Sequence, residues 1–110
     1  MMDEPLTAMG VIRAKPGREQ DLGRRMSALL EPTRAEPGCL AYDLYQSTED
    51  PTVWVLIERW RAVADLDAHV LSSHMKAFLA CAAEVLDGPP DNFRLKLTPW
   101  ASDATHCEAT

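Results

Sequence analysis

The chain has 110 residues, which is enough for one compact domain and too few for a second hydrophobic core of ordinary size. Hydrophobic residues make up 46% and charged residues 25%, so the composition excludes an intrinsically disordered or fibrous chain. The formal net charge of -6 has the wrong sign for a surface that neutralises nucleic-acid phosphates or coats an anionic membrane. We therefore expect one folded domain over residues 1–100 and a polar tail over 101–110, with no nucleic-acid partner.

The sequence predicts neither a membrane span nor a secretory signal. Apolar runs such as residues 54–57 are far shorter than the roughly 20 residues that cross a bilayer. The acidic start over residues 1–5 lacks the basic and apolar regions of a secretory signal. Cys39, Cys81 and Cys107 form no Cys-x-x-Cys pair and predict neither a disulfide framework nor a zinc site. We expect a cytoplasmic protein with reduced thiols.

The predicted elements begin with a strand over residues 6–14, which is mostly apolar and therefore expected to be covered on both faces. A turn at residues 15–17 leads into a helix over 17–35. Its apolar stripe is Leu22, Met26, Leu29, Leu30 and Thr33. Because Pro32 lacks a backbone N–H, the last turn is expected to kink before residues 36–38 end the helix.

A hairpin of two strands is predicted next. Over residues 39–46, alternation places Leu40, Tyr42 and Leu44 on one face. Residues 47–51 have turn chemistry, and the β-branched and aromatic residues of 52–61 predict the second strand. One face of that strand carries Trp54, Leu56, Glu58 and Trp60.

The remaining predicted elements are helical segments over 62–71 and 74–87 and a last strand over 93–100. Ser72 and Ser73 can cap the second helical segment. Its apolar stripe is Phe78, Leu79, Ala82, Val85 and Leu86. The order strand, helix, strand, strand, helix, strand predicts an α+β protein with the ferredoxin-like split βαβ fold and an antiparallel sheet.

The sequence contains no P-loop, G-x-G-x-x-G, H-E-x-x-H or G-x-S-x-G motif, so candidate chemistry comes from individual residues. Helical spacing from Leu66 places His69, and spacing from Phe78 places His74, on or beside an apolar helix face. A half-buried imidazole can take a proton from a phenol or an activated carbon acid, or it can simply hydrogen-bond to the backbone. Because five-residue spacing across a Ser-Ser break does not put both imidazoles on one helix face, the spacing predicts no metal site.

Aromatic and polar residues of the hairpin are candidates for a binding pocket. Trp54 and Trp60 are either ordinary core residues or a wall against which a flat ring stacks. Glu58, which lies between apolar neighbours, needs an arginine or histidine partner or becomes protonated, and so is either a structural ion pair or a pocket acid. Tyr42 is either a ligand for a substrate oxygen or a core residue with its hydroxyl at the surface.

Four short phrases, in this order and spacing, resemble the antibiotic biosynthesis monooxygenase family, and in particular its quinol monooxygenase group. They lie within roughly residues 6–98 and are Glu36-Pro37-Gly38-Cys39, Tyr42-Asp43-Leu44-Tyr45-Gln46, Glu58-Arg59-Trp60, and His69 with His74-Met75-Lys76-Ala77-Phe78. The resemblance implies a ferredoxin-like unit that forms a homodimer by packing two sheets into an α+β barrel. An apolar first strand also favours a partner sheet on the face opposite the helices.

The resemblance implies oxygenation without metal, flavin, haem or any other cofactor. A small electron-rich hydroquinone, phenol or anthrone would lose a proton, and the resulting anion would itself reduce dioxygen and end as a quinone. His69 or His74 would be the catalytic base, and Glu58 would orient an imidazole or an arginine. Substrate contacts would come from Tyr42, Trp54, Glu58, Trp60 and Phe78.

The same resemblance leaves other functions open. Haem-degrading relatives rely on an asparagine and a tryptophan where this chain has Gly10 and His69, so haem degradation is disfavoured. Relatives that process phosphorylated autoinducer-2 also carry a histidine, four residues and a second histidine, so an isomerase is an alternative. A dimer that binds an aromatic ligand without catalysis is a further alternative.

Overall fold

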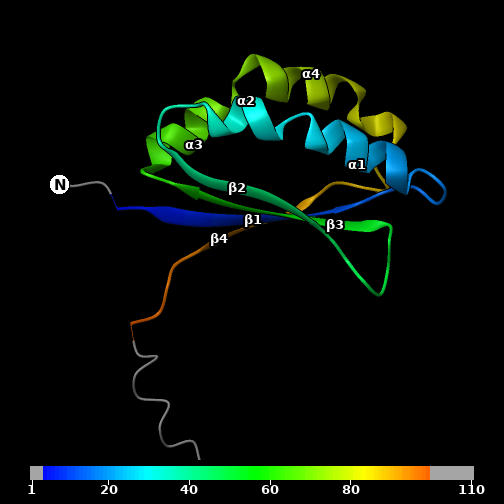
Figure 1. The fold of residues 1–110 in the computed structure, drawn as a ribbon, viewed down its shortest axis with the longest axis horizontal. Coiled ribbons are helices and arrows are strands. Elements are labelled where there is room, and N and C mark those ends of the chain that lie inside the picture. The colour runs from blue at the N-terminus through cyan, green and yellow to red at the C-terminus, as the bar shows by residue number, and fades with distance from the viewer. Residues whose placement is uncertain (1–3, 100–110) are drawn as a thin grey trace, which may run out of the picture.

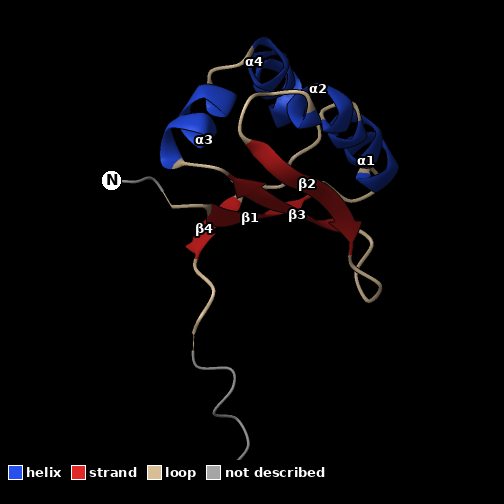
Figure 2. Ribbon diagram, turned by 60° about the vertical axis from the view of Figure 1, so that its left-hand side comes forward, coloured by secondary structure: helices blue, strands red, loops and turns tan. Residues whose placement is uncertain are grey.

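A four-stranded antiparallel sheet carries its helices on one face, in a computed structural model that describes residues 4–99 (Figures 1 and 2). The strands are β1 (Leu6–Arg13), β2 (Cys39–Gln46), β3 (Val53–Trp60) and β4 (Asp91–Leu95). The helices are α1 (Glu19–Ser27), α2 (Leu30–Arg34), α3 (Val63–Val70) and α4 (Ser73–Cys81), and a short 3₁₀ turn, η1 (Ala82–Glu84), follows α4. This arrangement confirms the predicted ferredoxin-like α+β class. No helix among residues 4–99 has the length and apolarity to cross a lipid bilayer.

The strand order is β2-β3-β1-β4, and each neighbouring pair is antiparallel. In this register Glu58 on β3 lies opposite Ala8 on β1 and Tyr42 on β2. Directly opposed residues of antiparallel strands share a face, so these three side chains form one row across the sheet. The row lies on the helix-covered side, where Ala8 and Tyr42 are buried.

The core lies between the helix layer and the sheet. Its largest fully buried side chains are Trp60, Tyr42, Leu22, Met26, His69, Val85 and Thr33. The α1 helix approaches the sheet closely at Gly23, where a Cβ atom would lie 2.5 Å from Cη2 of Trp54. Because real Cβ contacts are longer than this, the absence of a side chain at Gly23 is what allows Trp54 to pack beneath α1.

The helix predicted over residues 17–35 is two helices, α1 and α2. Pro32 has no N–H to donate to the carbonyl of Ala28. In the turn just before it, the amide of Leu29 donates to the carbonyl of Met26, three residues back, at 3.0 Å. This tighter turn separates the two helices. The predicted kink is therefore an interruption at residues 28 and 29, whose backbone angles stay in the right-handed helical region, and it comes earlier than the last turn.

The second half of the chain departs from prediction at the ends of its elements. Ser72 is the N-cap of α4, as expected, and its Oγ accepts from the amide of Met75 at 3.3 Å. The helix predicted to reach residue 87 ends at Cys81, and Leu79, assigned to its apolar stripe, is 53% exposed. The β4 strand ends at Leu95 because that residue already pairs with Thr7, near the start of β1. The rest of the predicted last strand is not strand up to residue 99, and Trp100 and the tail over 101–110 lie outside the described residues.

The two faces of the sheet differ in how the described chain covers them. On β1, Ala8, Gly10 and Ile12 are buried beneath the helices, whereas Met9 and Val11 on the opposite face are only partly buried. Other apolar groups stay largely exposed, including Tyr45, Phe93 and Leu95. Helices cover one face only (Figure 2), so residues 4–99 do not supply the expected cover for the second face.

Two smaller predictions concern Leu40 and the cysteines. Leu40, predicted to share a face with Tyr42, is 51% exposed because the register shifts between Cys39 and Ala41. Such a bulge inserts an extra residue and turns its side chain out of the alternating pattern. Cys39 and Cys81 are free thiols, as predicted, and Cys107 lies outside the described residues.

Candidate functional site

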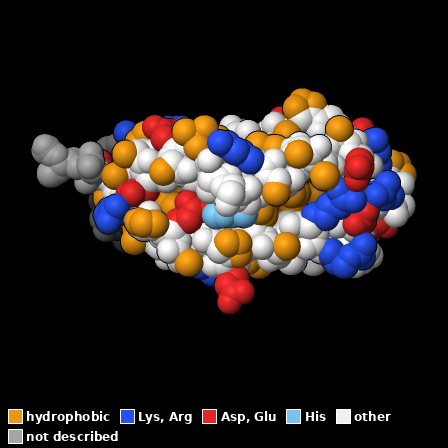
Figure 3. Space-filling model, turned by 90° about the horizontal axis from the view of Figure 1, so that it is seen from above, with side chains coloured by type: hydrophobic (Ala, Val, Ile, Leu, Met, Phe, Trp, Pro, Cys, Tyr) orange, Lys and Arg blue, Asp and Glu red, His pale blue; other side chains and the backbone are white. Residues whose placement is uncertain are grey.

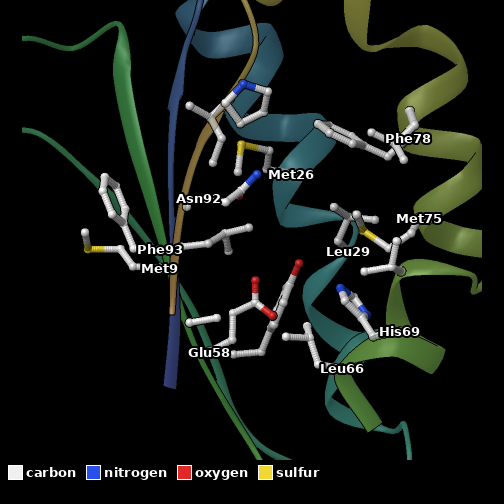
Figure 4. Close-up of a pocket in the computed structure, with 18 of the residues that line it drawn as sticks. Met9, Met26, Leu29, Glu58, Leu66, His69, Met75, Phe78, Asn92 and Phe93 are labelled. Atoms are coloured by element: carbon white, nitrogen blue, oxygen red, sulfur yellow. The ribbon is translucent and has the colours of Figure 1, made fainter. Parts of the chain in front are cut away.

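A cavity of about 350 Å³ lies between the helix-covered face of the sheet and the helices (Figure 4). Its walls are apolar and include Met26, Leu29, Leu56, Leu66, Met75 and Phe78. Five residues with polar side chains line it: Tyr42, Glu58, His69, Asn92 and Arg94. An apolar cavity of this size with a few polar groups is typical of a site for a small organic molecule. Met9 and Phe93 also border it through β1 and β4, although their side chains point to the other side of the sheet (Figure 4).

Glu36 reaches this region from the turn between α2 and β2. The turn depends on Gly38, whose φ of +83° is a conformation that residues with a side chain rarely adopt. A Cβ atom at Gly38 would also collide with the carboxylate of Asp65 on α3. The carbonyl of Gly38 accepts from the amide of Arg61 at 2.8 Å, which ties the turn to the start of the segment that carries α3. The turn thereby brings Glu36 next to the helix that holds His69.

His69 is oriented by Glu36 and by two aromatic rings. Its Nδ1 lies 2.8 Å from Oε2 of Glu36, and the side chain is 2% exposed. The ring contacts Tyr42 edge-on at a centroid distance of 5.3 Å and Trp60 at 5.0 Å. A carboxylate only accepts, so in the neutral imidazole the proton is on Nδ1 and the lone pair is on Nε2. Nε2 is then the ring nitrogen available to accept a proton from a molecule in the cavity.

His74 binds the same carboxylate oxygen from the other side. Its Nε2 lies 2.6 Å from Oε2 of Glu36, and its side chain is 20% exposed. It does not line the cavity and instead borders a shallow depression together with Arg25 and Glu84. The two imidazole rings are 5.9 Å apart, so the fold brings together two histidines that sequence spacing alone had kept apart. The three ligand atoms of Glu36, His69 and His74 lie within 4.8 Å of one another and are able to contact one cation.

Glu58 and Tyr42 supply the other buried polar groups of the cavity. The hydrogen-bond partner of Glu58 is a tryptophan, since Oε1 accepts from Nε1 of Trp60 at 2.8 Å. Burial raises the pKa of the Glu58 carboxyl, although the Trp60 hydrogen bond and nearby His69 act in the opposite direction. Burial likewise raises the pKa of the Tyr42 phenol far above its usual value. The Tyr42 hydroxyl is buried, not at the surface, and no partner within residues 4–99 meets hydrogen-bond geometry, although the Thr33 hydroxyl is near enough to lower the Tyr42 pKa.

The predicted site residues divide into two groups. His69, Tyr42, Glu58 and Phe78 line the cavity, whereas His74, Trp54 and Trp60 do not. Trp54 and Glu58 share a strand face, but four residues of strand separate them by roughly 13 Å. A shared face therefore does not imply a shared site. Trp60 contacts two residues that line the cavity: its Nε1 donates to Glu58, and its ring packs against His69.

Glu36 is the main functional candidate that sequence reasoning did not assign. It appears in the phrase Glu36-Pro37-Gly38-Cys39, but it is 33 residues from His69 and 38 from His74. Asn92 was also missed, and in Figure 4 its side chain points from β4 into the cavity. The signal for both was weak, because no local period relates residues that meet only across the fold.

Comparisons with known proteins agree with this architecture. The sequence profile of the family described as "Antibiotic biosynthesis monooxygenase" matches residues 5–80. "Putative monooxygenase Rv0793" of Mycobacterium tuberculosis is 35% identical over 80% of this chain and 86% of its own length. The solved structure of Rv0793 superposes with a TM-score of 0.81, at 33% identity, and covers 89% of this chain and 99% of that one.

Two further relatives extend the comparison. "Probable quinol monooxygenase YgiN" of Escherichia coli is 30% identical over 66% of this chain and 80% of its own length. An uncharacterized protein of Synechocystis, sll1783, is 28% identical over 81% of this chain. The chain spans only 60% of the length of sll1783.

Proposed function

The chain belongs to the antibiotic biosynthesis monooxygenase family, and on that premise we propose that it oxidises a small electron-rich aromatic with dioxygen to a quinone. The substrate would be of the hydroquinone, phenol or anthrone type, and the reaction would need no bound cofactor. The named relatives support monooxygenase activity, and the name of the YgiN relative supports a quinol. The single observation that carries the proposal is the hydrogen bond between Nδ1 of His69 and Glu36 beside an apolar cavity.

His69 is the base in this proposal. Its Nε2 takes the acidic proton of the bound substrate, and Glu36 stabilises the imidazolium that forms because its carboxylate remains hydrogen-bonded to Nδ1. The same hydrogen bond keeps the ring in the required tautomer. A positioned general base of this kind contributes roughly 10²–10⁴-fold to a rate.

The substrate anion supplies the electrons for dioxygen reduction. One oxygen atom forms a new C–O bond at the activated ring carbon, the O–O bond breaks, and the other atom leaves as water. The two hydrogens of that water come from the substrate, one from the acidic group and one from the carbon that becomes a carbonyl. The apolar walls of the cavity favour this chemistry by excluding bulk water from the peroxide.

Tyr42 and Glu58 are proposed to bind substrate oxygens. No partner of the buried Tyr42 hydroxyl within residues 4–99 meets hydrogen-bond geometry, so a substrate oxygen can satisfy it at little cost. The raised pKa of Glu58 favours its protonated form, which donates a hydrogen bond to an oxygen on the ring. Phe78 and the other apolar wall residues are proposed to contact the ring itself.

The test is oxygen uptake by metal-stripped protein over a panel of hydroquinones, naphthols and anthrones, with autoxidation subtracted. We expect protein-dependent uptake that His69→Gln lowers roughly 10²–10⁴-fold, the range for loss of a general base. Uptake that His69→Gln leaves unchanged contradicts the assigned base. Turnover of substrate without oxygen supports the isomerase alternative, and ligand binding without turnover supports a binding protein.

A homodimer is the proposed assembly. Support comes from the sheet face opposite the helices, where Met9, Val11 and Phe93 lie without cover from residues 4–99. Two such faces packed together would remove apolar area from water at roughly 25 cal/mol per Å². Val11→Glu is expected to convert a dimer into monomers in light scattering coupled to gel filtration. A wild-type protein that is monomeric at all concentrations contradicts the assembly.

A further inference from the structure

We propose that Glu36, His69 and His74 also form a binding site for a divalent transition-metal ion of the zinc class, and that its occupation blocks the base. The metal site stands on the geometry of the cluster alone. Only the blocking effect rests on the function proposed above for His69. The two parts are therefore tested separately.

The ligand set fits this class of ion. Two imidazole nitrogens and one carboxylate oxygen are the donors that zinc, cobalt and nickel prefer, whereas magnesium and calcium prefer oxygen alone. Each donor comes from a different segment: Glu36 from the turn after α2, His69 from α3 and His74 from α4. The donor atoms lie within 4.8 Å of one another. A water molecule would complete a four-coordinate site.

Small movements suffice to admit the ion. The two nitrogens now lie 2.8 and 2.6 Å from Oε2 of Glu36, at hydrogen-bond distances. Zinc holds its ligands at roughly 2.0–2.2 Å, which places tetrahedral ligand atoms roughly 3.3 Å apart, so each histidine nitrogen separates from Oε2 of Glu36 by roughly 0.5–0.7 Å. Rotation of the flexible Glu36 side chain provides this opening while His69 stays packed between Tyr42 and Trp60.

The cluster is accessible and negatively charged. The side chains of Glu36 and His74 are 14% and 20% exposed, so an ion reaches them without crossing the cavity. Figure 3, which views the helix side, shows imidazole surface beside an acidic side chain among apolar patches. A divalent cation compensates the charge of the Glu36 carboxylate.

Metal at Nδ1 of His69 has a defined chemical consequence. A neutral imidazole carries one proton, so a metal on Nδ1 leaves that proton on Nε2. The nitrogen proposed to accept the substrate proton then becomes a donor. No atom is lost or oxidised in this change, and removal of the metal restores the original tautomer.

The experiment uses the full chain with His106→Gln and Cys107→Ser, because that pair of neighbouring residues is itself able to bind metal. Cobalt is titrated and its visible d–d absorption is followed, and zinc is titrated by calorimetry. We expect one ion per chain, with affinity lowered roughly 100-fold or more in Glu36→Gln and in His74→Gln, since even outer partners of metal ligands are worth roughly 10–100-fold. Glu31→Gln, which removes an exposed carboxylate from α2, is the matched control and is expected to bind like the parent.

Three results overturn the metal site: no binding, binding that Glu36→Gln and His74→Gln leave unchanged, or equal loss in Glu31→Gln. Circular dichroism of each variant separates loss of the site from loss of the fold. Zinc is also expected to raise the melting temperature of the parent and not of Glu36→Gln.

For the blocking effect, zinc is expected to stop oxygen uptake and a chelator to restore it. If metal binds but oxygen uptake is unaffected by it or depends on it, the blocking effect is wrong and the metal site stands. If no oxygen uptake occurs with or without metal, the result contradicts the proposed function and not the metal site.

Discussion

His69 and His74 hydrogen-bond to the same oxygen of Glu36, yet their surroundings differ in every other respect. His69 is 2% exposed, packs against two aromatic rings and lines the cavity, whereas His74 is 20% exposed and borders a surface depression. A shared partner therefore does not imply a shared role. Access to the cavity, and not contact with the acid, separates the proposed base from its neighbour.

The largest expected effect comes from exchanging each histidine in turn. His69→Gln is expected to lower turnover roughly 10²–10⁴-fold because it removes the base. His74→Gln is expected to lower it less than roughly 10-fold, because the glutamine amide can still donate to Glu36, one hydrogen bond of about 1 kcal/mol. Oxygen uptake under substrate saturation measures both. Equal losses in the two variants would show that the histidines act as a unit.

Glu36→Gln tests the partner that the two histidines share. The variant keeps an oxygen that accepts from Nδ1 of His69 but loses the charge that stabilises the imidazolium. Hydrogen bonds to charged groups contribute about 1.5–3 kcal/mol, so we expect turnover to fall roughly 10- to 100-fold. Glu31→Gln on the exposed side of α2 is the control. A Glu36→Gln variant with full activity would remove Glu36 from the proposed mechanism.

Gly38→Ala tests the turn that carries Glu36 to both histidines. Gly38 and Gly17 have nearly equal φ angles, +83° and +84°, but only Gly38 has an atom within reach of an added Cβ. Gly17→Ala is therefore expected to cost about 1 kcal/mol for the backbone conformation alone. Gly38→Ala is expected to cost about 2–4 kcal/mol because Asp65 must also move. Urea unfolding measures both, and equal costs would show that the contact with Asp65 relaxes freely.

Glu58→Gln is expected to give the smallest effect. It changes a residue of the cavity that His69 lines and leaves the surroundings of His74 unchanged. Burial raises the pKa of Glu58 above its ordinary value of 4.5, so folding favours the protonated form. The stability that this group contributes is complete below pH 4.5 and is lost as the pH rises through the higher pKa of the folded state. With a chelator present, the unfolding free energy of Glu58→Gln minus that of the wild type is expected to increase as the pH rises. Parallel pH profiles would contradict the raised pKa.

Prediction from sequence was accurate for the elements and poorer for their ends. The strand over 39–46 and the ferredoxin-like order followed from alternation and helical spacing, which are local properties of the chain. The kink at Pro32 was predicted, but the position of the interruption between α1 and α2 and the early end of β4 were not, because hydrogen bonds decide where an element stops. Leu40 shows the same limit, since a bulge reversed its expected side.

Local patterns in the chain were enough to predict the fold class, the order of elements and which histidines lie near apolar helix faces. Contacts between distant segments join Glu36 to His69 and His74, bring Tyr42 and Glu58 to the same cavity, and pack Trp54 beneath α1. Periodicity relates residues within a helix or strand, whereas Glu36 and His69 are 33 residues apart. Their contact depends on a glycine turn and on helix packing that no single segment encodes.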